Sequence, residues 1–182
     1  MRFNFFSKYF PTPEYLRPRH VGLSFSDSNI RAILFDGTKE RPTLKSIIVP
    51  LEKGIITDGS ISDSEKIVEK LKIIKKSFDI PFVFFTVPDE LVYIFSASVP
   101  TNPKGDLTES ISFIMEENVP LPLSDLVFDF YPTKINKEGD EYKASVVVSA
   151  CSKKEIEKYL EVLKKSEFVP VGCIHESQAI AR

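Results

Sequence analysis

Alternating apolar and polar residues near the beginning of the chain predict a β-hairpin. Val21, Leu23 and Phe25 alternate with small or polar neighbours, and an apolar run resumes over residues 30–34. A polar turn at residues 27–29 separates the two runs, which is the pattern of two paired antiparallel strands. We expect this hairpin to open the folded part of the chain and a third strand to follow over residues 43–49.

Stripes of apolar residues at helical spacing predict three helices, each opened by a capping box in which two side chains satisfy free backbone N–H groups. The boxes begin at Ser62, Asp106 and Ser152, each with a glutamate three residues later. The remaining strands are expected over residues 82–87, 91–97, 127–135, 142–150 and 168–174. A polar, glycine-containing turn joins 127–135 to 142–150, so these two strands should pair as a hairpin.

Composition narrows the class of protein. The chain has 182 residues, 42% hydrophobic and 27% charged, as in a folded globular protein. A net charge of −2 gives no general attraction for nucleic acid, and no apolar run is long enough to cross a bilayer. Residues 1–19 are expected to be a leader whose aromatic residues either dock on a membrane surface or pack on the chain's own domain.

The cysteines and histidines do not have the spacing expected of a metal site or of a catalytic nucleophile with its base. Cys151 and Cys173 have no metal-ligand spacing and are expected to be buried, structural thiols. Cys173 and His175 lie two apart on a strand and so share a face, but no third group or oxyanion motif accompanies them. Glu116 and Glu117 point about 100° apart on a helix and do not form a carboxylate pair.

The first hairpin resembles the first phosphate motif of the actin-like ATPase superfamily, and most closely that of the type IV pilus assembly protein PilM family. The family's magnesium-organising aspartate falls on Ser24, and its phosphate-approaching glycine falls on Ser26. Both substitutions weaken the motif, because a hydroxyl is not the hard anionic ligand that Mg²⁺ prefers and a Cβ crowds the backbone approach. The equivalents of the phosphate loop are therefore Gly22, Ser24, Ser26, Ser28 and Arg31.

Further family-like stretches follow in the same order. They are a Pro-Leu-x-x-Gly run over residues 50–61, the pair Val99 and Pro100, a Pro-Leu-Pro helix end at 120–122, and residues 176–182. The resemblance implies a mixed α/β fold: a partial actin-like, ribonuclease H-like first subdomain with an inserted small α+β subdomain of the 1C type, as in the FtsA branch. The expected division is 20–97, an insert over 98–170, and a return at 171–182, as the N-terminal portion of a longer family chain.

The resemblance also implies a function. PilM proteins bind the cytoplasmic tail of the inner-membrane protein PilN, so we expect a cytoplasmic scaffold, peripheral to the inner membrane through its partners, with pilus motor components as further partners. Enzymatic activity and a bound cofactor are not expected, and ATP with Mg²⁺ would require a complete protein. The partner groove is expected at Phe95, Val99, Pro100, Leu121, Pro122 and Asp125. The alternatives are an actin-like ATP-binding protein and an FtsA-like cell-division adaptor.

Overall fold

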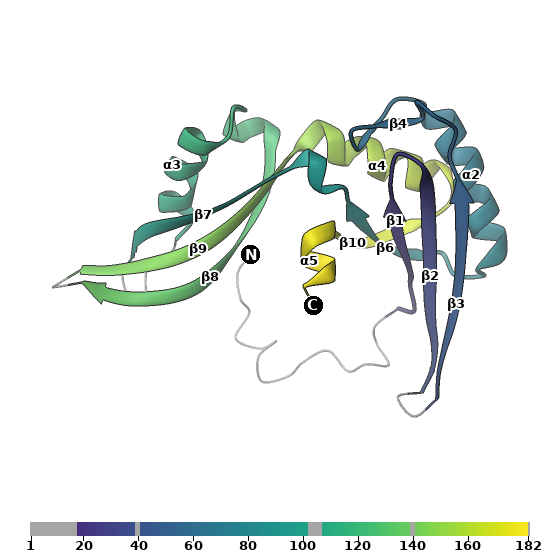
Figure 1. The fold of residues 1–182 in the computed structure, drawn as a ribbon, viewed down its shortest axis with the longest axis horizontal. Helices are drawn as coiled ribbons and strands as arrows, with labels where there is room; N and C mark the ends of the chain where they lie inside the picture. Colours follow the sequence, from purple (N-terminus) through teal and green to yellow (C-terminus); the bar gives the residue numbers. More distant parts are fainter. Residues whose placement is uncertain (1–17, 39–40, 102–106, 139–140, 182) are drawn as a thin grey trace.

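Two β-sheets, each with its own helices, make up the fold (Figure 1). The structure is a computed structural model that describes residues 18–38, 41–101, 107–138 and 141–181. The larger sheet has five strands in the order β10-β6-β1-β2-β3. Its strands are β1 (Val21–Phe25), β2 (Asn29–Thr38), β3 (Arg41–Pro50), β6 (Phe82–Val87) and β10 (Val169–His175). Strands β1, β6 and β10 run parallel, whereas β2 is antiparallel to both β1 and β3.

The predicted opening hairpin is confirmed. Strand β1 pairs with β2 in a register that places Leu23 opposite Ala32. Val21, Leu23 and Phe25 are buried, as their alternation with polar neighbours requires. They face helices α2 (Ser64–Ser77) and α4 (Lys153–Lys165), whose apolar stripes complete the first core.

The second sheet has three antiparallel strands in the order β7-β9-β8. They are β7 (Val92–Thr101), β8 (Leu126–Glu138) and β9 (Glu141–Ser152), so the predicted hairpin of residues 127–135 and 142–150 is confirmed. Helix α3 (Thr108–Asn118) covers one face, and a single 3₁₀ turn, η3 (Leu123–Asp125), leads into β8. A second core forms between α3 and this face of the sheet.

A two-strand hairpin fixes the turn-rich segment that follows β3. Strands β4 (Ile56–Thr57) and β5 (Ser60–Ile61) are joined by Asp58 and Gly59, which both have positive φ. The Asp27 carboxylate accepts hydrogen bonds from the backbone N–H groups of these two residues, each at 3.2 Å. The tip of the first hairpin thereby holds the turn of the second.

The predicted capping boxes form only in part. Helix α2 is capped by Asp63, whose carboxylate accepts from the Lys66 N–H at 3.1 Å, and not by Ser62. Asp106 lies outside the described residues, and α3 begins without a side-chain cap. Ser152 is the N-cap residue of α4 but makes no capping hydrogen bond. A nearby aspartate therefore replaces the predicted serine at the clearest of the three helix starts.

Side-chain packing divides the chain differently from the predicted boundaries. Tyr159, Val162 and Leu163 of α4 lie in the first core, although residues 98–170 were expected to form the insert. All of β7 belongs to the second sheet, although residues 91–97 were expected in the first subdomain. The chain crosses between the sheets at η2 (Asp89–Leu91) and again between β9 and α4. The second unit therefore spans roughly β7 to β9, and α4 returns to the first.

The C-terminal end of the described chain is the short helix α5 (Glu176–Ile180), which follows β10 and lies between the two sheets in Figure 1. In the described ranges, no helix is both long enough and apolar enough to cross a bilayer. We call the region between the two sheets the seam. Strands β9 and β10 and helices α4 and α5 border it.

Candidate functional site

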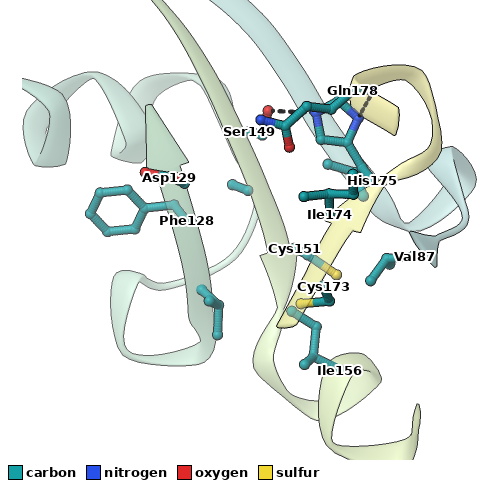
Figure 2. A pocket seen from close by; sticks show the side chains of 13 residues that line it. Val87, Phe128, Asp129, Ser149, Cys151, Ile156, Cys173, Ile174, His175 and Gln178 are labelled. Atoms are coloured by element: carbon teal, nitrogen blue, oxygen red, sulfur yellow. Dashed lines mark hydrogen bonds between the residues drawn. The ribbon is translucent and has the colours of Figure 1, made fainter. Parts of the chain in front are cut away.

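An open pocket of about 200 Å³ lies at the seam between the two sheets (Figure 2). Side chains from both units line it. The apolar ones include Val87, Val92, Val127, Ile156 and Ile174, and the polar ones include Asp129, Ser149, His175 and Gln178. An apolar wall with a few polar groups is typical of a binding site.

One wall of the pocket is the face of the three-stranded sheet that α3 does not cover. Val127 is paired with Cys151, and Asp129 with Ser149, so these four residues form adjacent cross-strand pairs. Because side chains alternate along a strand, residues 127, 129, 149 and 151 project from the same face. The covered face instead carries the second core. The regular alternation of the sheet thus supplies both a core and a pocket wall.

A chain of polar contacts crosses the seam. The Ser149 hydroxyl lies 3.1 Å from Nε2 of His175, and Nδ1 of His175 lies 3.3 Å from Oδ1 of Asp89. Figure 2 shows the imidazole of His175 between Ser149 and Gln178, whose backbone N–H is 3.3 Å from the same Nδ1. Nδ1 can donate to Asp89 or accept from the N–H of Gln178, so the position of the ring proton selects between these contacts.

The carboxylate of Asp89 ties this chain to the first turn of α5. It accepts from the backbone N–H of Ser177 at 3.1 Å and also from the Ser177 hydroxyl. Burial opposes the charged form, but the hydrogen bonds from Ser177 and His175 outweigh burial and hold the pKa of Asp89 below its ordinary value. Asp89 therefore stays ionised at neutral pH and positions the start of α5.

The order serine, histidine and aspartate is that of a hydrolase triad, but the surroundings of Ser149 differ from those of a nucleophile. Ser149 lies within the central strand β9, paired with Ile94 of β7 and Asp129 of β8. Its backbone N–H is therefore part of the sheet and does not face an oxyanion position. The serine–histidine contact joins the two sheets.

The polar residues expected at the phosphate loop form hydrogen bonds within the chain, mostly inside the first hairpin. The Ser24 hydroxyl donates to Oε1 of Glu176 at 3.1 Å. The Ser26 hydroxyl lies 3.1 Å from the Asn29 carbonyl oxygen and accepts from the Asn29 N–H at 3.2 Å, which closes the turn. Ser28 lies 3.5 Å from Ser26 in the same exposed turn.

The two remaining loop positions are also engaged within the hairpin. Nε of Arg31 donates to Oδ1 of Asn29 at 3.0 Å. A Cβ at Gly22 would stand 3.0 Å from Cγ2 of Ile33, so the glycine makes room for its cross-strand neighbour. Burial, together with the charges of Asp89 and Glu90, raises the pKa of Glu176 above its ordinary value.

The residues expected to form the partner groove lie elsewhere. Val99 is fully buried, and Phe95 and Leu121 pack against the same second core. Pro100, Pro122 and Asp125 are exposed. Among the described residues that line the pocket, none of the six appears. A partner could reach Val99 only by opening the second core, so the six residues do not form one open groove.

The two cysteines differ in burial. Cys151 is buried, as expected, whereas Cys173 is exposed, which corrects the expectation of two buried thiols. Both line the pocket, and burial raises the pKa of both thiols, that of Cys151 to about 11. In the described part of the chain, no three His, Cys, Asp or Glu side chains are grouped as a metal site would require.

The arrangement of the two sheets defines the class of protein. A mixed five-stranded sheet interrupted by a small α+β unit is the expected partial actin-like subdomain with a 1C-type insert. The family model described as Type IV pilus assembly protein PilM matches residues 22–181. The chain therefore belongs to the PilM family, as its sequence motifs indicated.

Solved structures share this fold. The PilM-PilN type IV pilus biogenesis complex matches with a TM-score of 0.77 and 22% identity, over 90% of this chain and 49% of that chain. The cytoplasmic domain of EpsL, an inner membrane component of the type II secretion system of Vibrio cholerae, matches with a TM-score of 0.60 and 14% identity, over 90% of this chain and 59% of that one. The chain thus spans about half the length of the first. No curated protein sequence matches it.

Proposed function

We propose that this chain is a cytoplasmic scaffold of type IV pilus assembly that binds the cytoplasmic tail of an inner-membrane pilus protein in the seam pocket. The observation that carries the proposal is the position of the pocket. Both units contribute to its wall, through Val127 and Ser149 on one side and Ile156 and Ile174 on the other. A segment bound there would contact both sheets at once.

Membership of the PilM family supports the choice of partner. One structural relative is a complex of PilM with PilN, which makes a PilN-like tail the first candidate for this chain. In this role the protein would stay in the cytoplasm and reach the inner membrane through its partner. Pilus motor components are the candidates for a second partner, bound outside the pocket.

The contacts of the first hairpin support a scaffold without ATPase activity. Ser24 is bonded to the Glu176 carboxylate, and a negative charge at that position repels a phosphate group. Ser26 closes its own turn. Phosphoryl transfer depends on positioning and charge stabilisation, and these side chains offer an incoming Mg·ATP neither a carboxylate at position 24 nor a glycine at position 26.

A peptide titration tests the proposal. A synthetic peptide with the cytoplasmic tail sequence of the PilN-like protein from the same organism is added to ¹⁵N-labelled protein. We expect the amide signals of Ser149 and Cys173 to shift on addition of peptide. Val127→Glu, which places a charge at the pocket, should weaken binding at least tenfold. The matched control Ile135→Glu changes an exposed residue farther along the same strand, outside the pocket lining, and should leave affinity unchanged.

Two results would contradict the proposal. One is the absence of amide shifts at high micromolar peptide. The other is an equal loss of affinity in Val127→Glu and Ile135→Glu, which would place the peptide away from the pocket.

A further inference from the structure

Strand β10 has a free edge. Among the strands that the structure describes it is paired with β6 alone, so alternate residues along its other side present backbone N–H and C=O groups without a described strand partner. Pro170 and a bulge between Pro170 and Gly172 interrupt the first half of this edge. From Gly172 to His175 the strand pairs regularly with β6 and contains neither proline nor lysine, the residues that commonly block edge pairing.

The pocket lies along most of this edge. Three consecutive residues of β10, Cys173, Ile174 and His175, line it, although successive side chains of a strand point to opposite faces. Phe85 and Thr86, the β6 partners of Cys173 and Ile174, are absent from the lining. Val87, the β6 partner of His175, does line it, so the pocket follows the backbone edge of β10 at Cys173 and Ile174 and reaches one face of the sheet at His175.

The ladder identifies which residue of β10 presents its backbone to the pocket. The N–H of Val169 donates to the Pro81 carbonyl at 2.8 Å, which directs Val169 toward the β6 side. The bulge adds one residue, so Gly172 and Ile174 face β6 and Cys173 faces the free edge. The backbone N–H and C=O of Cys173 are thus the central hydrogen-bonding pair of the open edge.

We infer that the partner tail binds as an added strand on β10, with main-chain hydrogen bonds to Cys173 and aliphatic side chains against the apolar wall of Val92 and Ile156. This rests on the proposed function and specifies how the same pocket recognises its ligand. The open edge from Gly172 to His175 pairs with about three residues of an extended segment, which span about 10 Å. The ligand class is therefore a short extended peptide recognised through its backbone.

An N-methyl scan of the tail peptide tests the added strand. Each amide of the synthetic PilN-like tail is methylated in turn, and the affinity for the full 182-residue chain is measured by calorimetry. Because only alternate N–H groups of a strand face its neighbour, methylation should weaken binding at least tenfold at every second position of the bound segment. Methylation of the residues between them should change affinity less than threefold.

Hydrogen exchange of the unmodified protein provides the second measurement. Saturating peptide should slow exchange of the Cys173 amide at least tenfold. The Ile174 amide, already directed to β6, is the internal control and should change little. Binding without an alternating methylation pattern, or with unchanged exchange at Cys173, overturns the added strand and leaves the proposed function standing. Absence of any binding overturns both.

Discussion

Ser149 on β9 and His175 at the end of β10 are joined by a hydrogen bond of 3.1 Å that links the two sheets across the seam. The contact is partly buried, and both side chains also line the pocket. His175 is held from its other side by Asp89, so its ring is fixed relative to the first unit. The Ser149 hydroxyl therefore ties the second unit to a side chain that the first unit holds in place.

Removal of that hydroxyl should loosen the seam. Ser149→Ala is expected to lower the free energy of unfolding by about 0.5 to 1.5 kcal/mol, the usual net value of one hydrogen bond, in urea denaturation followed by circular dichroism. Ser145→Ala is the matched control on the same strand, because the Ser145 side chain has no hydrogen bond to another described residue. Equal losses in both variants would refute a special role for the serine–histidine contact.

Removal of the Tyr159 hydroxyl should lower the free energy of unfolding more than removal of the Ser149 hydroxyl does. It donates to the Gly59 carbonyl oxygen, and Tyr159 is completely buried. Tyr159→Phe leaves that carbonyl without its partner, so we expect the free energy of unfolding to fall by about 1 to 3 kcal/mol. Tyr131→Phe, at a residue that is 71% exposed, should change it by less than about 0.5 kcal/mol. A neutral Tyr159→Phe would show that water satisfies Gly59.

Glu155 should contribute stability in a pH-dependent way. Its carboxylate accepts from Ser60 and from Lys158, both at 2.8 Å. Burial opposes the charge, but these hydrogen bonds outweigh burial and lower the pKa of Glu155 below 4.5. A lowered pKa stabilises the folded state above the ordinary value, and the contribution disappears as pH falls through the folded value. Glu155→Gln should cost about 1 to 2 kcal/mol at pH 7.

Glu155→Gln also tests the direction of the pH dependence. The difference in unfolding free energy between the wild type and Glu155→Gln should shrink progressively as pH falls below 4.5, the ordinary pKa of the group. Glu161→Gln is the control, because Glu161 pairs with Lys165 on an exposed part of the same helix. A difference that stays constant from pH 7 to acid pH would mean that the carboxylate charge does not carry the effect.

The cysteines should react at different rates. Cys173 is exposed and Cys151 is buried, with its pKa raised to about 11. The thiolate is the reactive form, so iodoacetamide at pH 8 should modify Cys173 first and Cys151 slowly, as measured by mass spectrometry of digested protein. Unfolding in urea should equalise the two rates. Faster labelling of Cys151 in the folded protein would contradict the packing described for β9.

Millimolar Mg·ATP should not change the melting temperature. A ligand at 100 times its dissociation constant would add about 2.7 kcal/mol, which a thermal scan detects readily. The Glu176 carboxylate beside Ser24 disfavours a phosphate at this hairpin. Stabilisation by Mg·ATP that is lost in Arg31→Ala would favour the alternative of an actin-like nucleotide-binding protein.

Much of the fold could be predicted because its signals are local. Val21, Leu23 and Phe25 show the period of two that defines β1, and the apolar stripe of Ile67, Leu71 and Ile74 defines the buried face of α2. The division between units could not be predicted the same way. The stripe of α4 fits either core equally well in sequence, and only three-dimensional packing assigns Tyr159 to the first.

The pocket escaped prediction for a related reason. Ser149, His175 and Asp89 lie far apart in sequence and meet only because β9 passes beside the end of β10. The spacing of Cys173 and His175 pointed to this strand end, but it gave no sign of which partner His175 would find. The groove residues were chosen from family-like motifs near Val99 and Leu121, and those motifs mark the second core.

The two crossings of the chain, at η2 and between β9 and α4, limit how the units can move. Cys151, near the end of β9, is buried in the first core, and Val92, at the start of β7, packs against that core, so side-chain packing holds both crossings as well. A relative movement of the two sheets would therefore have to disturb the packing of the first core. A ligand that fits the seam without such movement leaves the first core intact, so the packing at the crossings favours ligands that match the seam in its present shape.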